Sequence, residues 1–146
     1  LCAQTADAPI HGGLKKGEPD PRIPFHIELV AEIDGHLVGF LEGDLCMAPN
    51  EKGDVVVVEP WEGYIHTIGV HPHFRRRGIG RRLLLAALHA YAEAGCVRAE
   101  LCTPSPNAAE FFRRCGGRPI AGAPEGNFEW LLPLRQGGEE AGREGA

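Results

Sequence analysis

The clearest chemical signal in the sequence is the run Arg75-Arg76-Arg77-Gly78-Ile79-Gly80, which lies between an apolar stretch and a strongly helical one. A glycine-rich turn that leads from a strand into a helix points several backbone N–H groups at one place, and the helix dipole adds partial positive charge there. Glycine lets a ligand approach where a Cβ would clash, so such turns bind phosphate groups. With three arginines beside it, this turn predicts a site for a ligand that carries a pyrophosphate.

The run is also compatible with simpler roles. The glycines can form a tight turn and nothing more, with the arginines as a solvated patch. Nucleic-acid binding is disfavoured by the net charge of −5 and by the lack of a basic stripe or interleaved aromatic residues. A dinucleotide fingerprint does not fit, because Leu83 occupies the third glycine position, and no Gly-Lys-Ser/Thr follows as in a P-loop.

Three side chains near the turn are candidates for acid–base chemistry. Glu62 lies just before the strand predicted over residues 64–70, and His66 lies within it. The two side chains share one face, because side chains alternate along a strand. Histidine changes its charge near neutral pH and can act through water, although a strand histidine is more often a hydrogen-bonded structural residue. Ser105 precedes the last predicted helix, where it serves either as a proton donor or as the N-cap that serine favours.

Neither the histidines nor the cysteines predict a metal site. His66, His71 and His73 lie close in sequence, but no carboxylate or cysteine completes a ligand set. The cysteines are odd in number and scattered, without a C-x-x-C pair, which argues for a reducing cytosol. They are Cys2, Cys46, Cys96, Cys102 and Cys115. We therefore expect a cytoplasmic protein that binds no metal.

Composition predicts one globular domain with flexible ends. A chain of 146 residues with 43% hydrophobic and 24% charged content can bury its own core. Residues 1–25 are rich in glycine and proline without an apolar period, so we expect an arm or loop there. Residues 26–134 form the predicted domain, and residues 135–146, rich in glycine and charge, a disordered tail. No apolar run has transmembrane length, so we expect no membrane partner.

Apolar periodicity and turn residues predict the elements that position these side chains. Asp34-Gly35 is a hairpin signal between two alternating stretches. Residues 79–94 repeat apolar side chains at helical spacing and connect two strands, which we expect to be parallel. A second, short helix begins at Pro106 and stops at Gly116. The predicted strands are 27–33, 36–47, 55–58, 64–70, 97–102 and 127–134.

The turn resembles the coenzyme A-binding turn of the GNAT superfamily of acyl-CoA-dependent N-acyltransferases. That turn reads Gln/Arg-x-x-Gly-x-Gly/Ala, which Arg75, Gly78 and Gly80 match. The stretch from Ile65 to Pro72 is similar to the strand and bend that precede it in the family. The run from Asn107 to Gly117 is similar to the helix that closes the coenzyme site. The resemblance covers roughly residues 27–134.

The resemblance implies an α/β fold with a mixed, mostly antiparallel sheet and helices on both faces. Two parallel central strands splay apart in that fold. The family places a strand and two helices before the hairpin that begins here at Ile27, and residues 1–25 have the wrong composition for them. We therefore expect a shortened N-terminal part.

The resemblance also implies which residues bind acetyl-CoA. The backbone of Ile68 and Val70 is expected to pair with pantetheine, and the Val70 N–H to stabilise the oxyanion. The expected pyrophosphate contacts are Arg75, Arg76, Arg77, Gly78, Ile79, Gly80 and Arg81. Asn107 is expected to reach pantetheine. Phe112 occupies the position of the family's tyrosine, which protonates the leaving thiolate, so that acid is missing.

We thus predict an N-acetyltransferase that transfers the acetyl group of acetyl-CoA to an amine, with a small cationic molecule as the favoured acceptor. Several acidic side chains with one opposing lysine suggest this charge, although charge runs are usually solvated faces. They are Glu42, Asp44, Glu51, Asp54, Glu59 and Glu62. The alternatives are a non-catalytic acyl-CoA-binding module and a protein lysine or N-terminal acetyltransferase. A homodimer is compatible with each of these functions.

Overall fold

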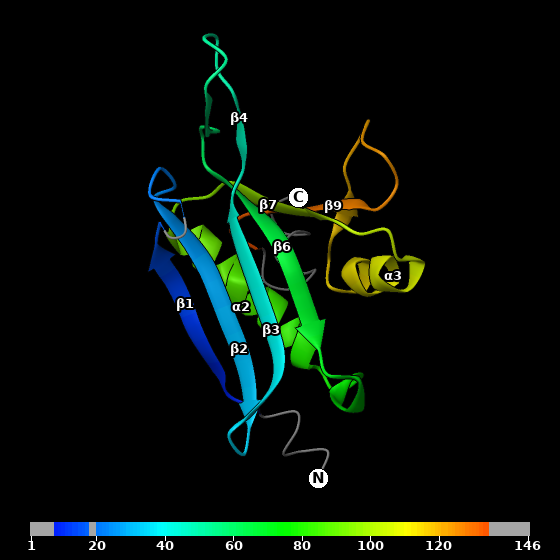
Figure 1. Cartoon of the computed structure of the whole chain (residues 1–146). Helices are drawn as coiled ribbons and strands as arrows, with labels where there is room; N and C mark the ends of the chain where they lie inside the picture. The colour runs from blue at the N-terminus through cyan, green and yellow to red at the C-terminus, as the bar shows by residue number, and fades with distance from the viewer. Residues whose placement is uncertain (1–7, 18–19, 135–146) are drawn as a thin grey trace, which may run out of the picture.

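A computed structural model describes residues 8–17 and 20–134 of the chain (Figure 1). Its strands are β1 Ile10–Lys16, β2 Phe25–Ile33, β3 His36–Leu45, β4 Met47–Pro49, β5 Val55–Val57, β6 Glu62–Val70, β7 Arg98–Cys102, β8 Arg118–Pro119 and β9 Asn127–Leu131. Its helices are the 3-10 turn η1 Pro72–Phe74 and the α-helices α2 Ile79–Glu93 and α3 Pro106–Arg114. The predicted tail, residues 135–146, lies outside the described residues.

Seven of these strands form one mixed sheet in the order β1-β2-β3-β6-β7-β9-β8. The ladders β1–β2, β2–β3, β3–β6, β7–β9 and β8–β9 are antiparallel. The pair β6–β7 is parallel, as the connection through α2 predicts. The short strands β4 and β5 form a separate two-stranded ribbon that projects from the end of the sheet (Figure 1).

The prediction of an arm or loop over residues 1–25 is wrong for Ile10–Lys16, which form the edge strand β1. Two features hid this strand. It contains Gly12, where a Cβ would collide with the backbone carbonyl of Glu28 on β2, and an apolar residue therefore cannot mark that position. It also carries exposed lysines, Lys15 and Lys16, which are typical of edge strands because charge discourages further pairing.

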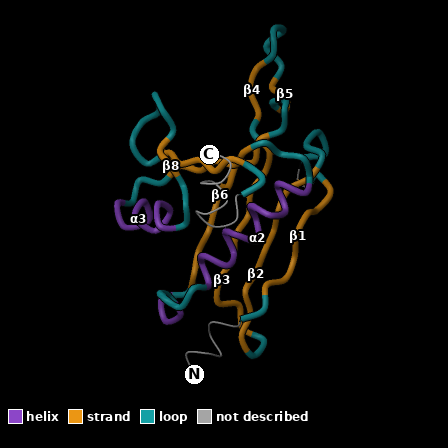
Figure 2. The backbone as a smooth tube through the Cα atoms, turned by 180° about the vertical axis from the view of Figure 1, so that it is seen from behind, coloured by secondary structure: helices purple, strands orange, loops and turns teal. Residues whose placement is uncertain are grey.

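Helix α2 covers one face of the sheet (Figure 2). Its buried side chains recur at helical spacing and pack on the strands; they are Ile79, Leu83, Leu84, Ala87, Leu88 and Tyr91. The Tyr91 hydroxyl donates to the backbone carbonyl of Asp44 at 2.9 Å, with the Tyr64 carbonyl at 3.2 Å. Tyr91 is therefore a core residue that links α2 to both β3 and β6, as its place on the predicted helix suggests.

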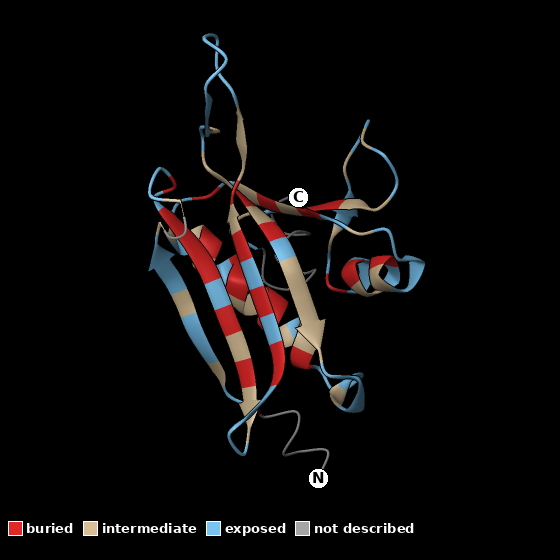
Figure 3. Ribbon diagram, in the orientation of Figure 1, coloured by how far each residue is buried: buried red, intermediate tan, exposed pale blue. Residues whose placement is uncertain are grey.

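The other face of β2, β3 and β6 has no helix over it among the described residues. Figure 3 shows buried and exposed positions alternating along β2 and β3, and Glu28, Phe40 and Glu42 are exposed on the uncovered side. Helix α3 packs on β9, through Phe112 against Phe128 and Trp130. The expected helices on both faces are thus not found over these strands, because the described residues before β2 form only β1. We call this uncovered side the open face.

None of the described helices is long and apolar enough to cross a membrane.

Candidate active site at the fork between β6 and β7

The two parallel strands separate after three residues. Glu62–Tyr64 of β6 pair with Arg98–Glu100 of β7, and β6 then continues along β3 to Val70. On its other side, β7 pairs with β9 along its whole length. From Ile65 onward, the β6 edge that faces β7 has no ladder partner among the described strands. Figure 1 shows the two strands running apart from this point, which we call the fork.

The backbone of Ile68 and Val70 points into the fork. The His71 N–H donates to the Val38 carbonyl at 2.8 Å, so these two residues form a hydrogen-bonded pair. Such pairs alternate with non-hydrogen-bonded ones along an antiparallel ladder. Val70 opposite Gly39 and Ile68 opposite Leu41 are therefore non-hydrogen-bonded pairs, whose N–H and C=O groups face away from β3. Their polar groups are directed toward the side where β7 has left.

A β-bulge lies beside the start of the fork. Thr67 pairs with Glu42 and Ile65 pairs with Gly43, so His66 is the extra residue between them. A bulge bends its strand and redirects the bulged side chain. His66 is exposed on the open face, where its Nε2 lies 3.1 Å from Oδ2 of Asp44. The Tyr64 ring packs edge-on against the His66 ring at 5.1 Å between centroids.

Beyond the open end of the fork, the predicted glycine turn leads from β6 into α2. Gly78 is the N-cap in the left-handed conformation, with φ of 84°, which glycine adopts at little cost. The first helical bond runs from the Arg82 N–H to the Gly78 carbonyl at 3.0 Å. The N–H groups of Ile79, Gly80 and Arg81 precede it and have no carbonyl within the helix to bond. The turn thus has the donor geometry of a phosphate site.

Positive side chains surround this turn. Arg75, Arg76, Arg77 and Arg81 are all exposed. Arg75 Nε donates to the Val70 carbonyl at 3.1 Å, which places its guanidinium at the end of β6. Arg81 Nη1 donates to the Arg114 carbonyl at 3.4 Å and so links the start of α2 to the end of α3. The arrangement supplies both charge and backbone donors for an anionic group.

On α3, the residue beside the turn is Phe111 rather than Phe112. A Cβ added at Gly80 would lie 3.2 Å from Phe111 Cζ and 3.5 Å from Val70 Cγ2. Phe112 is 4% exposed and points toward β9. Phe112 holds the position along the chain that matches the family's tyrosine, but neighbouring helix residues differ by about 100° in direction. Phe111 rather than Phe112 therefore borders the glycine turn, at which the coenzyme is expected to bind.

The remaining predicted residues of this region lie at the start of α3. The Ser105 hydroxyl accepts from the Ala108 N–H at 3.2 Å, so Ser105 is the N-cap of α3. This contact is the structural alternative to a proton-donating role. Asn107 is exposed in the first turn of the same helix.

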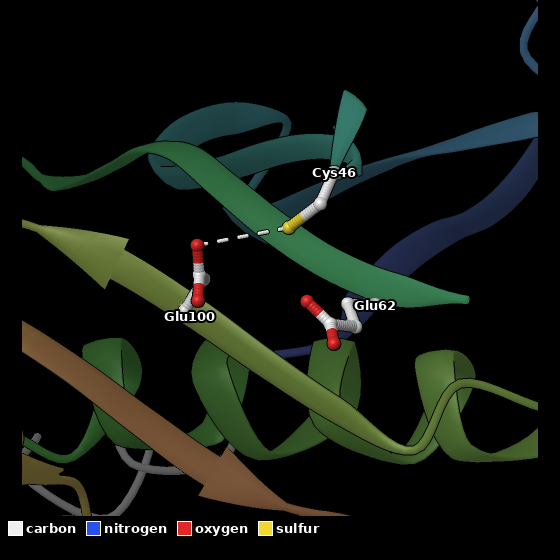
Figure 4. A group of neighbouring side chains, drawn as sticks. All are labelled: Cys46, Glu62 and Glu100. Carbon is white, nitrogen blue, oxygen red and sulfur yellow. Dashed lines mark hydrogen bonds between the residues drawn. The ribbon is translucent and has the colours of Figure 1, made fainter. Parts of the chain in front are cut away.

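A network of charges closes the base of the fork. The Arg98 guanidinium lies 3.4 Å from Glu62, 2.8 Å from Glu100 and 2.5 Å from Glu129. The Cys46 thiol lies 3.7 Å from Oε1 of Glu100 and contacts the Gly63 carbonyl at the same distance (Figure 4). Burial, with the charges of Glu100 and Glu62, raises the pKa of the Cys46 thiol to about 12.

Cys46, Glu62 and Glu100 have their ligand atoms within 4.8 Å of one another (Figure 4). Their chemistry does not favour a metal ion. Both carboxylates already face the Arg98 guanidinium, with which a cation would compete.

Residues 9–117 match the acetyltransferase (GNAT) family, about the span in which the fork and the turn lie. The chain belongs to this family. The resemblance of its turn to the GNAT coenzyme turn correctly predicted the family.

One relative is N-alpha-acetyltransferase RimI of Mycobacterium tuberculosis. The chain is 35% identical to it over 99 residues, which cover 68% of this chain and 61% of that protein. The chain therefore spans about three fifths of that relative.

Solved structures of GNAT proteins share the fold. Naa20 of Chaetomium thermophilum, in complex with a bisubstrate analogue, gives a TM-score of 0.57 at 22% identity, over 72% of this chain and 65% of that one. The PaiA N-acetyltransferase of Thermoplasma acidophilum, in complex with coenzyme A, gives a TM-score of 0.55 at 20% identity, over 73% of this chain and 61% of that one.

Three residues around the fork were not singled out from the sequence, namely Arg98, Glu100 and Phe111, and Asp44 was named only as one of several acidic side chains. Asp44 and Glu100 lie on strands other than β6 and meet Tyr64 and His66 only through the sheet register. Their positions alternate correctly with buried neighbours, but alternation alone does not say which strands are adjacent. The one usable signal was the even spacing of Arg98, Glu100 and Cys102 on a single strand.

Proposed function

We propose that this protein transfers the acetyl group of acetyl-CoA to the nitrogen of a primary amine. The proposal rests on one observation: backbone hydrogen-bond donors follow one another along a single line. The outward backbone of Ile68 and Val70 leads directly to the N–H groups of Ile79, Gly80 and Arg81. A ligand with an extended amide arm and a pyrophosphate has the matching order of groups.

In this proposal, pantetheine lies along β6 in the fork and the pyrophosphate at the start of α2. The exposed arginines Arg75, Arg76, Arg77 and Arg81 provide charge, and Gly78 and Gly80 allow close approach. Phe111 borders the same turn, and Asn107 lies four residues before it, on the same face of α3. The Val70 N–H is the donor for the oxyanion of the transition state, since it points into the fork.

The reaction forms a bond between the acceptor nitrogen and the acetyl carbon and breaks the C–S bond. The nitrogen loses a proton, and the thiolate of coenzyme A gains one. We assign the first proton to His66, with Asp44 as the residue that orients its ring, because this pair is exposed on the open face beside the fork. Glu62 and Glu100 are the other candidate bases; Arg98 pairs with both carboxylates, and Glu100 stands at the last paired position, opposite Tyr64.

Tyr64 is the proposed source of the second proton, because neither Phe111 nor Phe112 has one to give. It lies on the open face at the last paired position of β6. The Tyr64 hydroxyl holds its proton at neutral pH even at the ordinary tyrosine pKa, and burial, with smaller effects of Cys102, Glu100 and Cys46, raises that pKa further. Ser105 is the alternative donor, although its hydroxyl already caps α3.

For the acceptor, we favour the α-amine of a polypeptide. The similarity to N-alpha-acetyltransferase RimI supports this choice. The open face supports it as well, because the described residues leave its strands β2, β3 and β6 uncovered and a chain can lie across them. A small cationic amine is the second candidate, favoured by Glu42, Asp44 and Glu62 on that face. Glu51 and Asp54 belong to the projecting ribbon and are remote from the fork.

The test is an assay of coenzyme A release from acetyl-CoA with a panel of acceptors. Peptides with free α-amines are compared with the same peptides blocked at the N-terminus, with lysine-containing blocked peptides and with polyamines. We expect turnover with free α-amines and none with blocked peptides that lack lysine. Turnover with polyamines alone would favour the small cationic acceptor. Binding of acetyl-CoA without turnover of any acceptor would favour a non-catalytic module.

Attraction of a cationic acceptor by these carboxylates weakens as salt is added, because the Debye length falls from about 10 Å at 0.1 M to about 3 Å at 1 M. The KM for the acceptor should rise with ionic strength more steeply than kcat falls. A KM that is independent of salt would show that Glu42, Asp44 and Glu62 form only a solvated surface.

A further inference from the structure

The two halves of the sheet meet at one short junction. On one side lie β1, β2, β3 and β6, and on the other β7, β9 and β8. Among the described residues, the ladder between the two halves is Glu62–Tyr64 with Arg98–Glu100, and the Val97 N–H donates to the Trp61 carbonyl at 2.9 Å just before it. A three-residue parallel ladder is a weak connection, since parallel pairing is slightly less stable than antiparallel pairing. Other contacts must therefore help to fix the angle at which β7 leaves β6.

Arg98 supplies such contacts from the middle of the junction. Its guanidinium reaches Glu62 on β6 at 3.4 Å, Glu100 on β7 at 2.8 Å and Glu129 on β9 at 2.5 Å. Arg98 thus contacts carboxylates on three strands, of which β6 lies on one side of the fork and β7 and β9 on the other. Glu129 is buried, at 8% exposure, and also accepts from Arg118 Nε at 3.1 Å. The planar donor set of arginine suits several carboxylates at once, which the single ammonium of lysine does not.

The charges make Arg98 hard to replace. Burial alone would lower the pKa of the Arg98 guanidinium, but Glu62, Glu100 and Glu129 together raise it. Without its charge, Glu62 and Glu100 would face each other across the junction with no cation between them, and Arg118 reaches only Glu129. Removal of one partner from a part-buried ion network leaves like charges that repel. That repulsion would push β6 and β7 apart at the base of the fork.

We infer that Arg98 is a positioning residue that sets the width of the fork, and thereby the affinity for acetyl-CoA, without touching either substrate. This inference rests on the proposed function, because the fork is where the coenzyme is proposed to bind. Coenzyme contacts lie on the side of the fork that begins at Ile65, whereas Arg98 lies at its closed base. Arg98 therefore affects the affinity for acetyl-CoA through the angle between β6 and β7.

The experiment measures acetyl-CoA affinity by calorimetry in four proteins: the wild type, Arg98→Lys, Arg98→Met and Arg118→Met. Substitutions that act on a site without contacting its ligand change affinity by about 3- to 30-fold. We expect a loss in this range for Arg98→Met and a smaller one for Arg98→Lys, which keeps the charge. Arg118→Met is the matched control, since it also bonds Glu129 but does not span the fork, and we expect its affinity to stay within about twofold of the wild type.

Melting temperatures separate this role from a purely structural one. If Arg98→Met and Arg118→Met lower the melting temperature alike but only the former loses affinity, the inference holds. The double variant Arg98→Met/Glu62→Gln should recover part of the lost affinity, because it removes the repulsion between Glu62 and Glu100. Equal affinities of the wild type and both Arg98 variants would overturn the inference. Failure of the wild type itself to bind acetyl-CoA would instead overturn the proposed function.

Discussion

The two ends of the fork differ in how they are built. At the open end, the turn from His71 to Arg81 is continuous in sequence, and it offers backbone donors and exposed arginines. At the closed end, Asp44, His66 and Glu100 come from three strands and offer hydrogen-bond acceptors and negative charge. One end is thus suited to an anion and the other to a cation.

This difference follows the chemistry of the proposed reaction. A pyrophosphate needs donors fixed by backbone, which a turn of a few residues can provide alone. An amine acceptor needs a base and a route to the acetyl carbon, which require side chains from neighbouring strands. If the two ends have these separate roles, substitutions at the turn should change coenzyme affinity, and those of Asp44, His66 and Glu100 at the closed end should change turnover.

The largest effect is expected from Gly80→Asp. The new carboxylate would stand where the pyrophosphate approaches, and a like-charge contact of several kcal/mol corresponds to a loss of affinity of about 100-fold or more. Isothermal calorimetry with acetyl-CoA measures this loss. Gly80→Ala is the control for bulk, since its Cβ would lie 3.2 Å from Phe111 Cζ and the ring must shift only slightly. Unchanged affinity in a folded Gly80→Asp protein would remove the turn from the coenzyme site.

At the closed end, His66→Ala should lower kcat while the affinity for acetyl-CoA stays constant. General base catalysis contributes about 100-fold or more, so we expect a decrease of that order. Asp44→Asn should give a smaller decrease, because it removes only the group that orients the imidazole. Glu42→Gln, on the same face of β3, is the control and should keep the wild-type kcat, since Glu42 is proposed to affect only the KM of a cationic acceptor. A small effect of His66→Ala together with a large one of Glu100→Gln would move the base to β7.

Substitutions on α3 test whether Phe111 or Phe112 borders the coenzyme site. Phe112→Ala should lower the free energy of unfolding by about 3–5 kcal/mol, because it opens a cavity between α3 and β9. Phe111→Ala should cost less stability, since the ring is only half-buried, and should instead weaken coenzyme binding. Denaturant titration and calorimetry measure the two quantities. Phe112→Tyr, which places a hydroxyl among Phe128 and Trp130, should destabilise by about 1–3 kcal/mol.

If Phe112→Ala left stability intact but abolished coenzyme binding, the assignment of the two rings would be reversed.

The same contrast explains how much the sequence predicts. The turn, both α-helices and the parallel pair follow from contiguous patterns, and the N-cap at Ser105 from its residue type. The edge strand β1 cannot be predicted in this way, because Gly12 serves close backbone contact with β2 and the strand shows no apolar period. The contact partners of His66 and Glu100 cannot be predicted from contiguous patterns either, because they depend on strand order and on the bulge at His66.

The smallest effect concerns the thiol at the closed end. With a pKa of about 12, only about a thousandth of Cys46 is thiolate at pH 9, whereas a thiol at the ordinary value of 9.0 is half ionised. The shift is upward, so it reduces reactivity at every pH below 12. Iodoacetamide at pH 9, followed by peptide mass spectrometry, should therefore label exposed Cys102 well before Cys46. Glu100→Gln should speed the labelling of Cys46, since it removes a negative charge that disfavours the thiolate. Equal labelling rates of Cys46 and Cys102 in the wild type would contradict this prediction. They would mean that burial and nearby carboxylates do not suppress the thiolate at the closed end, and the contrast with the positively charged turn would be lost.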